Sequence, residues 1–329
     1  MMRLSVMWNV DRTIAASGSS PVAEQILDRW PHDPGSVRFF RSSANFLYVL
    51  RYDGKRRFLR FAESSERRRT SIDAEIALVE WLAEEGLVVV CPVRSRNERF
   101  VETVATDWGT FHAVVFEALE GTQFEVDELD DVGFQNWGAA LGQLHATIRK
   151  YPGSGASTRS TLQDHLSQAR HLLPEDAPAV REELSRLKLA LSTLPVDRDT
   201  YGLIHFDFEL DNLIWQGRTV QMLDFDDCAR AWYAADIAFA LRDYFDAGAD
   251  LHSPCVRAFL DGYAAHTPLA DEQIAQIPLF LRLGRLIQFA RIARALDVTK
   301  DPGQPDWLSS LIDKLEVRMD ANSMAITGE

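Results

Sequence analysis

The first part of the chain alternates between apolar and polar residues in a way that favours β-strands. From Asn45 to Tyr52 apolar side chains recur at every second position, and this period is typical of a half-buried strand. Asp53 and Gly54 follow, a dipeptide that strongly favours the two-residue turn of a β-hairpin. The pattern therefore predicts a hairpin whose second strand runs from Arg56 to Phe61, preceded by a short amphipathic helix over residues 21–30.

One helix is predicted inside this strand-rich part. Thr70 and Ser71 can cap its start, and Gly86 is suited to end it. The arginine run just before it, residues 67–69, is predicted to be a solvated loop. Three further strands are predicted after the helix, at Leu87–Val93, Arg99–Ala105 and Phe111–Phe116.

Helical spacing dominates the chain after Gly121. The predicted helices are Asp131–Arg149, Thr161–Leu173, Val180–Leu194 and most of the chain from Trp232 onward, with a Gly/Ser-rich loop at Pro152–Ser160 and a short β segment at Leu203–Leu223. This order predicts an α+β fold of two lobes, with a strand-rich N-terminal lobe at residues 1–118 and a helical C-terminal lobe at residues 119–329. Two-lobed layouts place their ligands between the lobes.

Composition narrows the possible partners. The chain has 329 residues, of which 46% are hydrophobic, enough for a large core. Its net charge of −14 argues against binding nucleic acid, because a phosphate backbone needs a basic surface. No apolar run approaches the roughly 20 residues needed to span a bilayer, and the three cysteines are far apart. We therefore expect a cytoplasmic protein with no membrane or nucleic-acid partner.

The segment with the clearest chemistry lies between two apolar stretches. Asp207 and Asn212 stand five residues apart in a polar loop, and Asp224 ends the next apolar stretch. Phosphoryl transfer needs these groups, because its transition state carries negative charge that a metal and positioned polar groups must stabilise. Asn212 and Asp224 offer the oxygen ligands that Mg²⁺ prefers, and Asp207 can accept the proton of an attacking hydroxyl.

The spacing His205-x-Asp207-x-x-x-x-Asn212 resembles the aminoglycoside phosphotransferase and choline kinase family, which has a protein-kinase-like fold. The family motif is H-G-D-x-x-x-x-N, followed by an apolar strand that ends in Asp; here Phe206 stands in the place of the usual Gly. The resemblance implies an ATP- or GTP-dependent kinase that phosphorylates a hydroxyl of a small molecule, with Asp207 as the base and with Mg²⁺ as cofactor.

The same resemblance assigns further residues. The phosphate-covering loop corresponds to Ser42, Ser43 and Ala44, which contain no glycine, so their backbone amides would hold the phosphates. Arg60 corresponds to the cation that anchors the phosphates, and Glu75 to its partner. The residues that correspond to the adenine-binding hinge are Phe116, Glu117, Ala118 and Leu119. His205 and Asp236 correspond to residues that brace the catalytic loop rather than react.

Two other functions stay open from the residues alone. A protein kinase is disfavoured because no A-P-E segment or long activation loop follows Asp224. A nucleotide-binding pseudokinase is suggested by the glycine-free phosphate loop, but the complete set of Asp207, Asn212 and Asp224 argues against it. The sequence does not predict the oligomeric state.

The residues near the predicted catalytic loop are compatible with two classes of acceptor. Acidic residues near the catalytic loop, interleaved with Trp232, Tyr233, Tyr244 and Phe245, favour an alcohol or sugar that carries an amine. Arginines in the same half of the chain favour a carboxylate-bearing acceptor such as homoserine; they are Arg230, Arg242, Arg282 and Arg285.

Overall fold

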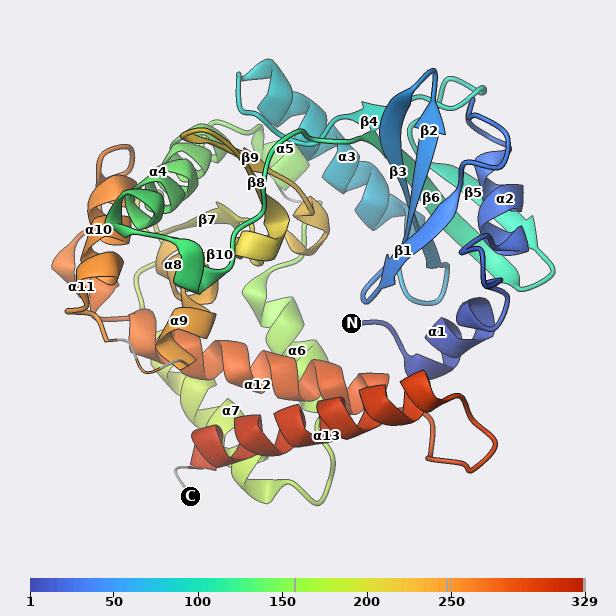
Figure 1. Ribbon diagram of the computed structural model, residues 1–329. Helices are drawn as coiled ribbons and strands as arrows, with labels where there is room; N and C mark the ends of the chain where they lie inside the picture. The colour runs from blue at the N-terminus through green and yellow to red at the C-terminus, as the bar shows by residue number, and fades with distance from the viewer. Residues whose placement is uncertain (157, 247, 249, 328–329) are drawn as a thin grey trace.

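The computed structural model describes residues 1–156, 158–246, 248 and 250–327. Its N-terminal part is an antiparallel sheet with the strand order β1-β2-β3-β6-β4, in which β5 also pairs with β6. Figure 1 shows this sheet on the side of the molecule opposite helices α4 and α10. The strands are β1 (Arg38–Ser42), β2 (Phe46–Tyr52), β3 (Lys55–Glu63), β4 (Pro92–Val93), β5 (Glu102–Thr106) and β6 (Gly109–Glu117).

The hairpin of β2 and β3 forms where the turn residues predict it. Asp53 and Gly54 both adopt the left-handed backbone conformation, with φ of 50° and 74°, as a two-residue hairpin turn requires. The alternating apolar side chains of β2, Phe46, Tyr48 and Leu50, are all fully buried. The predicted hairpin is therefore confirmed, and it fixes which face of the sheet covers the N-terminal core.

Three helices accompany the sheet. Helix α2 (Pro21–Leu27) and helix α3 (Arg69–Glu84) agree with the predicted helices, and Gly86 ends α3 with φ of 89°. Helix α1 (Leu4–Asp11) was not predicted, and it buries Leu4, Met7 and Val10. Figure 1 shows α1 at the base of the sheet, beside the C-terminal helix α13 (Asp306–Thr327).

The segment predicted as the strand Leu87–Val93 is the main departure in this part. Only Pro92 and Val93 pair with the sheet, as β4. Val88 and Val90 instead exchange backbone hydrogen bonds with Met222, at 2.9 Å each. The segment therefore joins the sheet to the part of the chain that carries Asp224, which local apolar pattern alone does not reveal.

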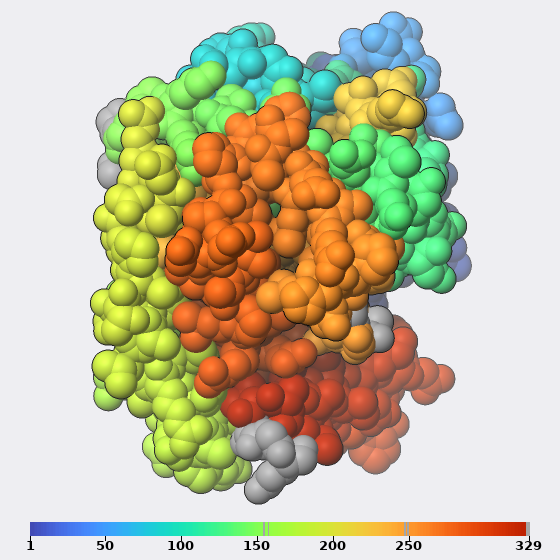
Figure 2. All heavy atoms as spheres, turned by 90° about the vertical axis from the view of Figure 1, so that its left-hand side faces the viewer, coloured from blue at the N-terminus to red at the C-terminus, as the bar shows by residue number. Residues whose placement is uncertain are grey.

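The C-terminal part is mainly helical, as predicted. In Figure 2, α10 and its neighbours, in orange, lie between the yellow-green α7 region and the red α13. Part of the predicted loop 152–160 forms the short helix α5 (Gly153–Ala156), whereas residue 157 lies outside the described residues. The other helices are α4 (Asp131–Ile148), α6 (Leu162–Leu172), α7 (Pro178–Ser192), α8 (Tyr233–Ala240), α9 (Arg242–Asp246), α10 (Pro254–Ala264), α11 (Asp271–Ile274) and α12 (Ile277–Ala295).

Helices α4 and α10 make the closest helix contact of this core. A Cβ atom added at Gly138 would lie only 1.9 Å from the carbonyl oxygen of Phe259, so glycine is required there. This close approach fixes α4 behind the loop 205–212, where Trp137 Nε1 donates a hydrogen bond of 3.2 Å to the carbonyl of Phe208. No helix among the described residues is long and apolar enough to cross a bilayer.

The β segment inside the helical part consists of two small antiparallel pairs. Strand β7 (Tyr201–Ile204) pairs with β10 (Ala229–Trp232), and β8 (Leu213–Gln216) pairs with β9 (Thr219–Met222). The sequence predicts β7 but not its partner β10, because the predicted β segment ends at Leu223. The two pairs hold the loop 205–212 and the turn 223–228 side by side, and these carry the candidate site.

Candidate active site

The loop 205–212 is held by buried hydrogen bonds to helix α8. Both carboxylate oxygens of Asp236 accept backbone N–H groups, from His205 and from Phe206, each at 2.7 Å. His145 Nε2 lies 3.0 Å from the same carboxylate, in a region with no solvent exposure. His205 Nε2 lies 3.1 Å from the carbonyl oxygen of Leu223. These contacts tie the loop to helix α8 through Asp236 and to the turn that follows β9 through His205.

Asp207 and Asn212 come together as their spacing suggests. Asn212 Nδ2 donates to the backbone carbonyl of Asp207 at 2.9 Å and to its carboxylate at 3.0 Å. Burial raises the pKa of Asp207, although Arg242 nearby acts to lower it. Arg242 Nη2 lies 3.7 Å from the Asp207 carboxylate and forms a closer ion pair with Glu209. Asp207 is therefore fixed in orientation and kept close to one cation.

Asp224 faces a concentration of negative charge. Burial raises its pKa well above the usual range, Asp226 adds to the rise, and Arg60 opposes it. Arg60 Nη1 lies 3.3 Å from Asp224, and Arg60 Nη2 lies 2.7 Å from Glu75 on helix α3. Arg60 thus reaches its expected partner Glu75 and the candidate metal ligand at the same time.

A divalent cation fits this donor set. Asn212 uses its amide nitrogen to hold Asp207, which leaves its side-chain oxygen available to a cation in the cavity that Asp224 also lines. A cation there would also offset the repulsion between Asp224 and its acidic neighbours. Among the described residues, no group of three or more His, Cys, Asp or Glu side chains is arranged to hold a metal.

A cavity of about 390 Å³ lies on the hinge side of Arg60. Phe116, Glu117 and Leu119 line it, whereas Ala118 does not. The backbone N–H groups of Glu117 and Ala118 already donate to the carbonyls of Cys91 and Arg56, at 3.0 and 3.2 Å. An adenine bound here would therefore depend on other backbone groups of the hinge than these two amides.

The phosphate loop is folded over the turn that carries Asp224. Ser42, Ser43 and Ala44 line the cavity that contains Asp207. The N–H of Ser43 donates to the carbonyl of Asn45 at 3.1 Å, so this amide is engaged inside the loop. Asn45 Nδ2 donates to Asp226 at 2.8 Å. This contact holds the tip of the loop against the turn that carries Asp224 and Asp226.

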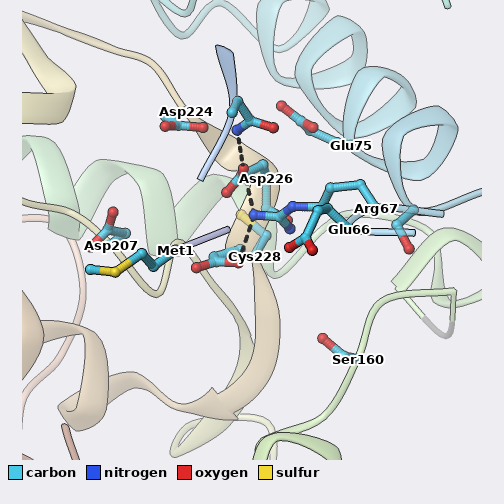
Figure 3. Close-up of polar contacts among 12 residues, drawn as sticks. Met1, Glu66, Arg67, Glu75, Ser160, Asp207, Asp224, Asp226 and Cys228 are labelled. Atoms are coloured by element: carbon cyan, nitrogen blue, oxygen red, sulfur yellow. Dashed lines mark hydrogen bonds and ion pairs between the residues drawn. The ribbon is translucent and has the colours of Figure 1, made fainter. Parts of the chain in front are cut away.

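Several residues of the site escaped sequence reasoning. Arg67, predicted to be solvated, donates to the carboxylates of Asp226 at 2.6 Å and Asp227 at 3.2 Å, so that prediction was wrong. Figure 3 shows its guanidinium directed at Asp226 rather than at solvent. The sequence does not distinguish Arg242 from the other arginines of the C-terminal part, and it places Asn45 in the phosphate-loop segment without a partner. No local pattern marks them, because each partner lies in a distant segment.

The cavity beside Asp207 has a volume of about 360 Å³. The aromatic residues expected to line an acceptor pocket do not line it, since Trp232 and Tyr233 are buried in the core. Tyr244 packs on Phe134 instead, with ring centroids 5.0 Å apart. The apolar wall is formed by other residues, which include Met1, Leu4, Phe206, Phe239 and Ile287.

These features define the class of protein. An antiparallel N-terminal sheet, a helical C-terminal part and a cleft with Asp207, Asn212, Asp224 and Arg60 are those of a phosphotransferase with a protein-kinase-like fold. The chain belongs to the phosphotransferase enzyme family known as APH, whose family model matches residues 36–272. It is an ATP-dependent small-molecule kinase of this family.

Individual relatives agree with this assignment. The chain is 26% identical over 289 residues to amicoumacin kinase of Bacillus subtilis (strain 168), covering 84% of this chain and 86% of that one. A solved amicoumacin kinase in complex with AMP-PNP, Ca²⁺ and Ami has a TM-score of 0.78 at 22% identity, covering 97% and 96% of the two chains. A microcompartment-associated aminopropanol kinase has a TM-score of 0.71 at 22% identity, covering 93% and 97%. At these identities the two structures establish the shared fold.

Proposed function

We propose that this protein transfers the γ-phosphate of ATP to a hydroxyl of a small molecule, with Asp207 as the base. The observation that carries the proposal is that Asp207, Asn212 and Asp224 line one cavity, in which the Asn212 amide fixes the Asp207 carboxylate. Asp207 can orient the acceptor hydroxyl and accept its proton as the phosphoryl group is transferred. Residues 1–118 would bind the nucleotide, and residues 119–329 would supply the base and the acceptor site.

Asn212 and Asp224 are the proposed ligands of a Mg²⁺ ion. Mg²⁺ would supply positive charge at the transferring phosphoryl group. Arg60, held by Glu75, would bind the phosphates from the sheet side, where its fork can contact two oxygens. The backbone of Ser42, Ser43 and Ala44 would cover them. The AMP-PNP and Ca²⁺ in the related amicoumacin kinase complex support a nucleotide–metal complex in this cleft.

The preferred acceptor in this proposal is an alcohol or amino sugar that carries an amine. Six carboxylates line the cavity around Asp207 against four arginines, an excess that favours a positively charged group. The similarity to an aminopropanol kinase points in the same direction. The support from aromatic residues is weaker than the sequence suggested, because none of the four expected rings lines the cavity.

A carboxylate-bearing acceptor is the second candidate. Arg242, Arg291 and Arg318 line the same cavity and could bind a carboxylate, as in a homoserine-type reaction. Arg242 is already paired with Glu209, however, and Arg291 with Asp227. Binding a second carboxylate there would have to compete with those pairs, which makes this candidate the weaker of the two.

ADP release with a matched panel of aminated, neutral and carboxylated alcohols tests the proposal. Aminated alcohols should give the lowest KM, and their KM should rise with salt as the attraction is screened. Asp207→Asn serves as the inactive control. Better turnover of carboxylated alcohols would select the second candidate, and nucleotide binding without turnover of any alcohol would favour a pseudokinase.

A further inference from the structure

A second cavity, of about 700 Å³, lies next to the one that contains Asp207. The two cavities are neighbours, because they share the lining residues Met1, Ala44, Asp227, Ile287 and Arg291. Its walls come from the segment before α3, from residues 158–160, and from helices α6 and α12. Figure 3 shows part of this region, with Arg67 and Glu66 on one side and Ser160 on the other.

Arginines outnumber acids in this cavity, although the protein as a whole carries a net charge of −14. Glu66 is shared by two guanidinium groups, Arg3 at 2.7 Å and Arg294 at 2.8 Å. The acids that line the cavity are Glu66, Asp164 and Asp227, and the arginines are Arg67, Arg68, Arg159, Arg291 and Arg294. The walls therefore contain more positive than negative charge, and a concave surface focuses that charge.

Arg159 is a buried cation in the wall of this cavity. It is only 7% exposed, and its guanidinium donates to the backbone carbonyls of Ser71, Phe225, Asp226 and Cys228 at 2.9–3.2 Å. Within the described part of the chain it forms no ion pair with a carboxylate. The carbonyl oxygens accept its N–H groups but do not cancel its charge, so Arg159 adds positive potential to the cavity wall.

The titration behaviour of two lining residues agrees with this charge balance. Burial acts to raise the pKa of Asp227, but Arg291 and Arg67 outweigh it and hold the pKa well below its usual range. Burial, and then Arg291, lower the pKa of His165 to about 4. The ionised Asp227 therefore indicates a positive local potential, whereas the neutral His165 reflects burial first and Arg291 second.

We propose that this arginine-lined cavity binds an anion with carboxylate or phosphate chemistry beside the catalytic centre. Guanidinium groups suit both, because their planar N–H groups match two oxygens of either anion. Arg68 is exposed and has no ion pair among the described residues, so it can contact an anion without losing a partner. The proposal goes beyond phosphotransfer itself, because the anion can bind with or without turnover.

The test uses inorganic phosphate as the probe, titrated into the full chain by calorimetry at constant ionic strength set with chloride. The titration is run with and without Mg²⁺ and AMP-PNP, so that phosphate bound at the γ-phosphate position is displaced. We expect one saturable phosphate site to persist with the nucleotide present. Arg68→Gln and Arg294→Gln should each weaken it by about fivefold, in line with the loss of one partly solvent-exposed hydrogen bond.

Arg69→Gln is the matched control, because Arg69 pairs with Asp73 at 2.9 Å and does not line the cavity. Its phosphate affinity should equal that of the wild type. Absence of a saturable site in the wild type, or equal weakening by Arg69→Gln, would overturn the proposal. Failure of AMP-PNP to bind would count against the proposed kinase function instead, and the comparison of Arg68→Gln with Arg69→Gln would then locate the phosphate site.

A kinetic comparison distinguishes two possible occupants of the cavity, an anionic group of the acceptor and a free anion. If the cavity holds the anionic end of the acceptor, Arg68→Gln should raise the KM for carboxylated or phosphorylated alcohols about fivefold and leave neutral alcohols unchanged. If it holds a free anion, phosphate should still bind while Arg68→Gln leaves the KM of every alcohol unchanged. Both results support an anion site.

Discussion

Phe206 occupies a backbone position that suits glycine, and this gives a sharp test of the structure. Its φ is 73°, in the left-handed region, where a residue with a Cβ atom costs roughly 1–2 kcal/mol relative to the right-handed conformation. Its ring is nevertheless 5% exposed and stacks on His165, with centroids 4.7 Å apart. The side chain is therefore retained in spite of an unfavourable backbone conformation.

Two substitutions separate the backbone effect from the packing effect. Phe206→Ala removes the buried ring and should lower the free energy of unfolding by about 3–5 kcal/mol. Phe206→Gly removes the same ring and also relieves the backbone. Glycine raises the entropy of the unfolded chain, at a cost of about 0.4–1 kcal/mol, and the relief of roughly 1–2 kcal/mol exceeds this. We therefore expect the glycine variant to be the more stable of the two, by up to about 1.6 kcal/mol.

Phe239 provides the matched control. It lies on helix α8, is 3% exposed, and its ring centroid is 5.0 Å from that of Phe206. In a helix, glycine is less stable than alanine by roughly 0.5–1 kcal/mol, so Phe239→Ala should be more stable than Phe239→Gly. Urea denaturation with equal m-values measures both pairs. If alanine is as stable as glycine at position 206, the reasoning from the left-handed backbone fails.

The remaining predictions concern the catalytic groups and pH. Asp207→Asn should lower kcat by roughly 10²–10⁴ and leave nucleotide affinity near that of the wild type; an equal loss of nucleotide binding would assign Asp207 to the metal or to the fold. Asp224→Ala should abolish turnover and Mg²⁺-dependent nucleotide binding while far-UV circular dichroism is unchanged, and near-normal turnover would contradict the ligand assignment. Arg60→Ala should raise the KM for ATP and lower kcat, because it removes the cation that Glu75 holds in place to bind the phosphates. Unchanged kinetics would mean that another residue anchors the phosphates. His165 has a folded pKa of about 4, below its unfolded value near 6.5, so the unfolded state binds more protons and stability should fall as pH drops from about 6.5 to 4. His165→Gln should reduce that slope in urea titrations, and an unchanged slope would exclude His165 as its source.

Local sequence determined those features that depend on neighbouring residues. The Asp53-Gly54 turn and the alternating pattern of β2 fixed the hairpin, because turn conformation and strand period are short-range properties. Asp207 and Asn212 stand five residues apart in one loop, so their mutual contact also lay within reach of the sequence. The pairing of Arg60 with Glu75 came from resemblance to a family, and the structure brings the two side chains together.

Tertiary structure alone decided which distant side chains meet. The Arg67 side chain is ion-paired rather than solvated, because packing of α3 against the turn after β9 places the carboxylates of Asp226 and Asp227 beside it. Trp232 was assigned to the acceptor pocket from its closeness in sequence to Asp224, but it is buried in the core. The partners Asn45 and Asp226 are 181 residues apart. Such contacts depend on how the sheet and the helices pack together, and no local period or turn signal encodes that packing.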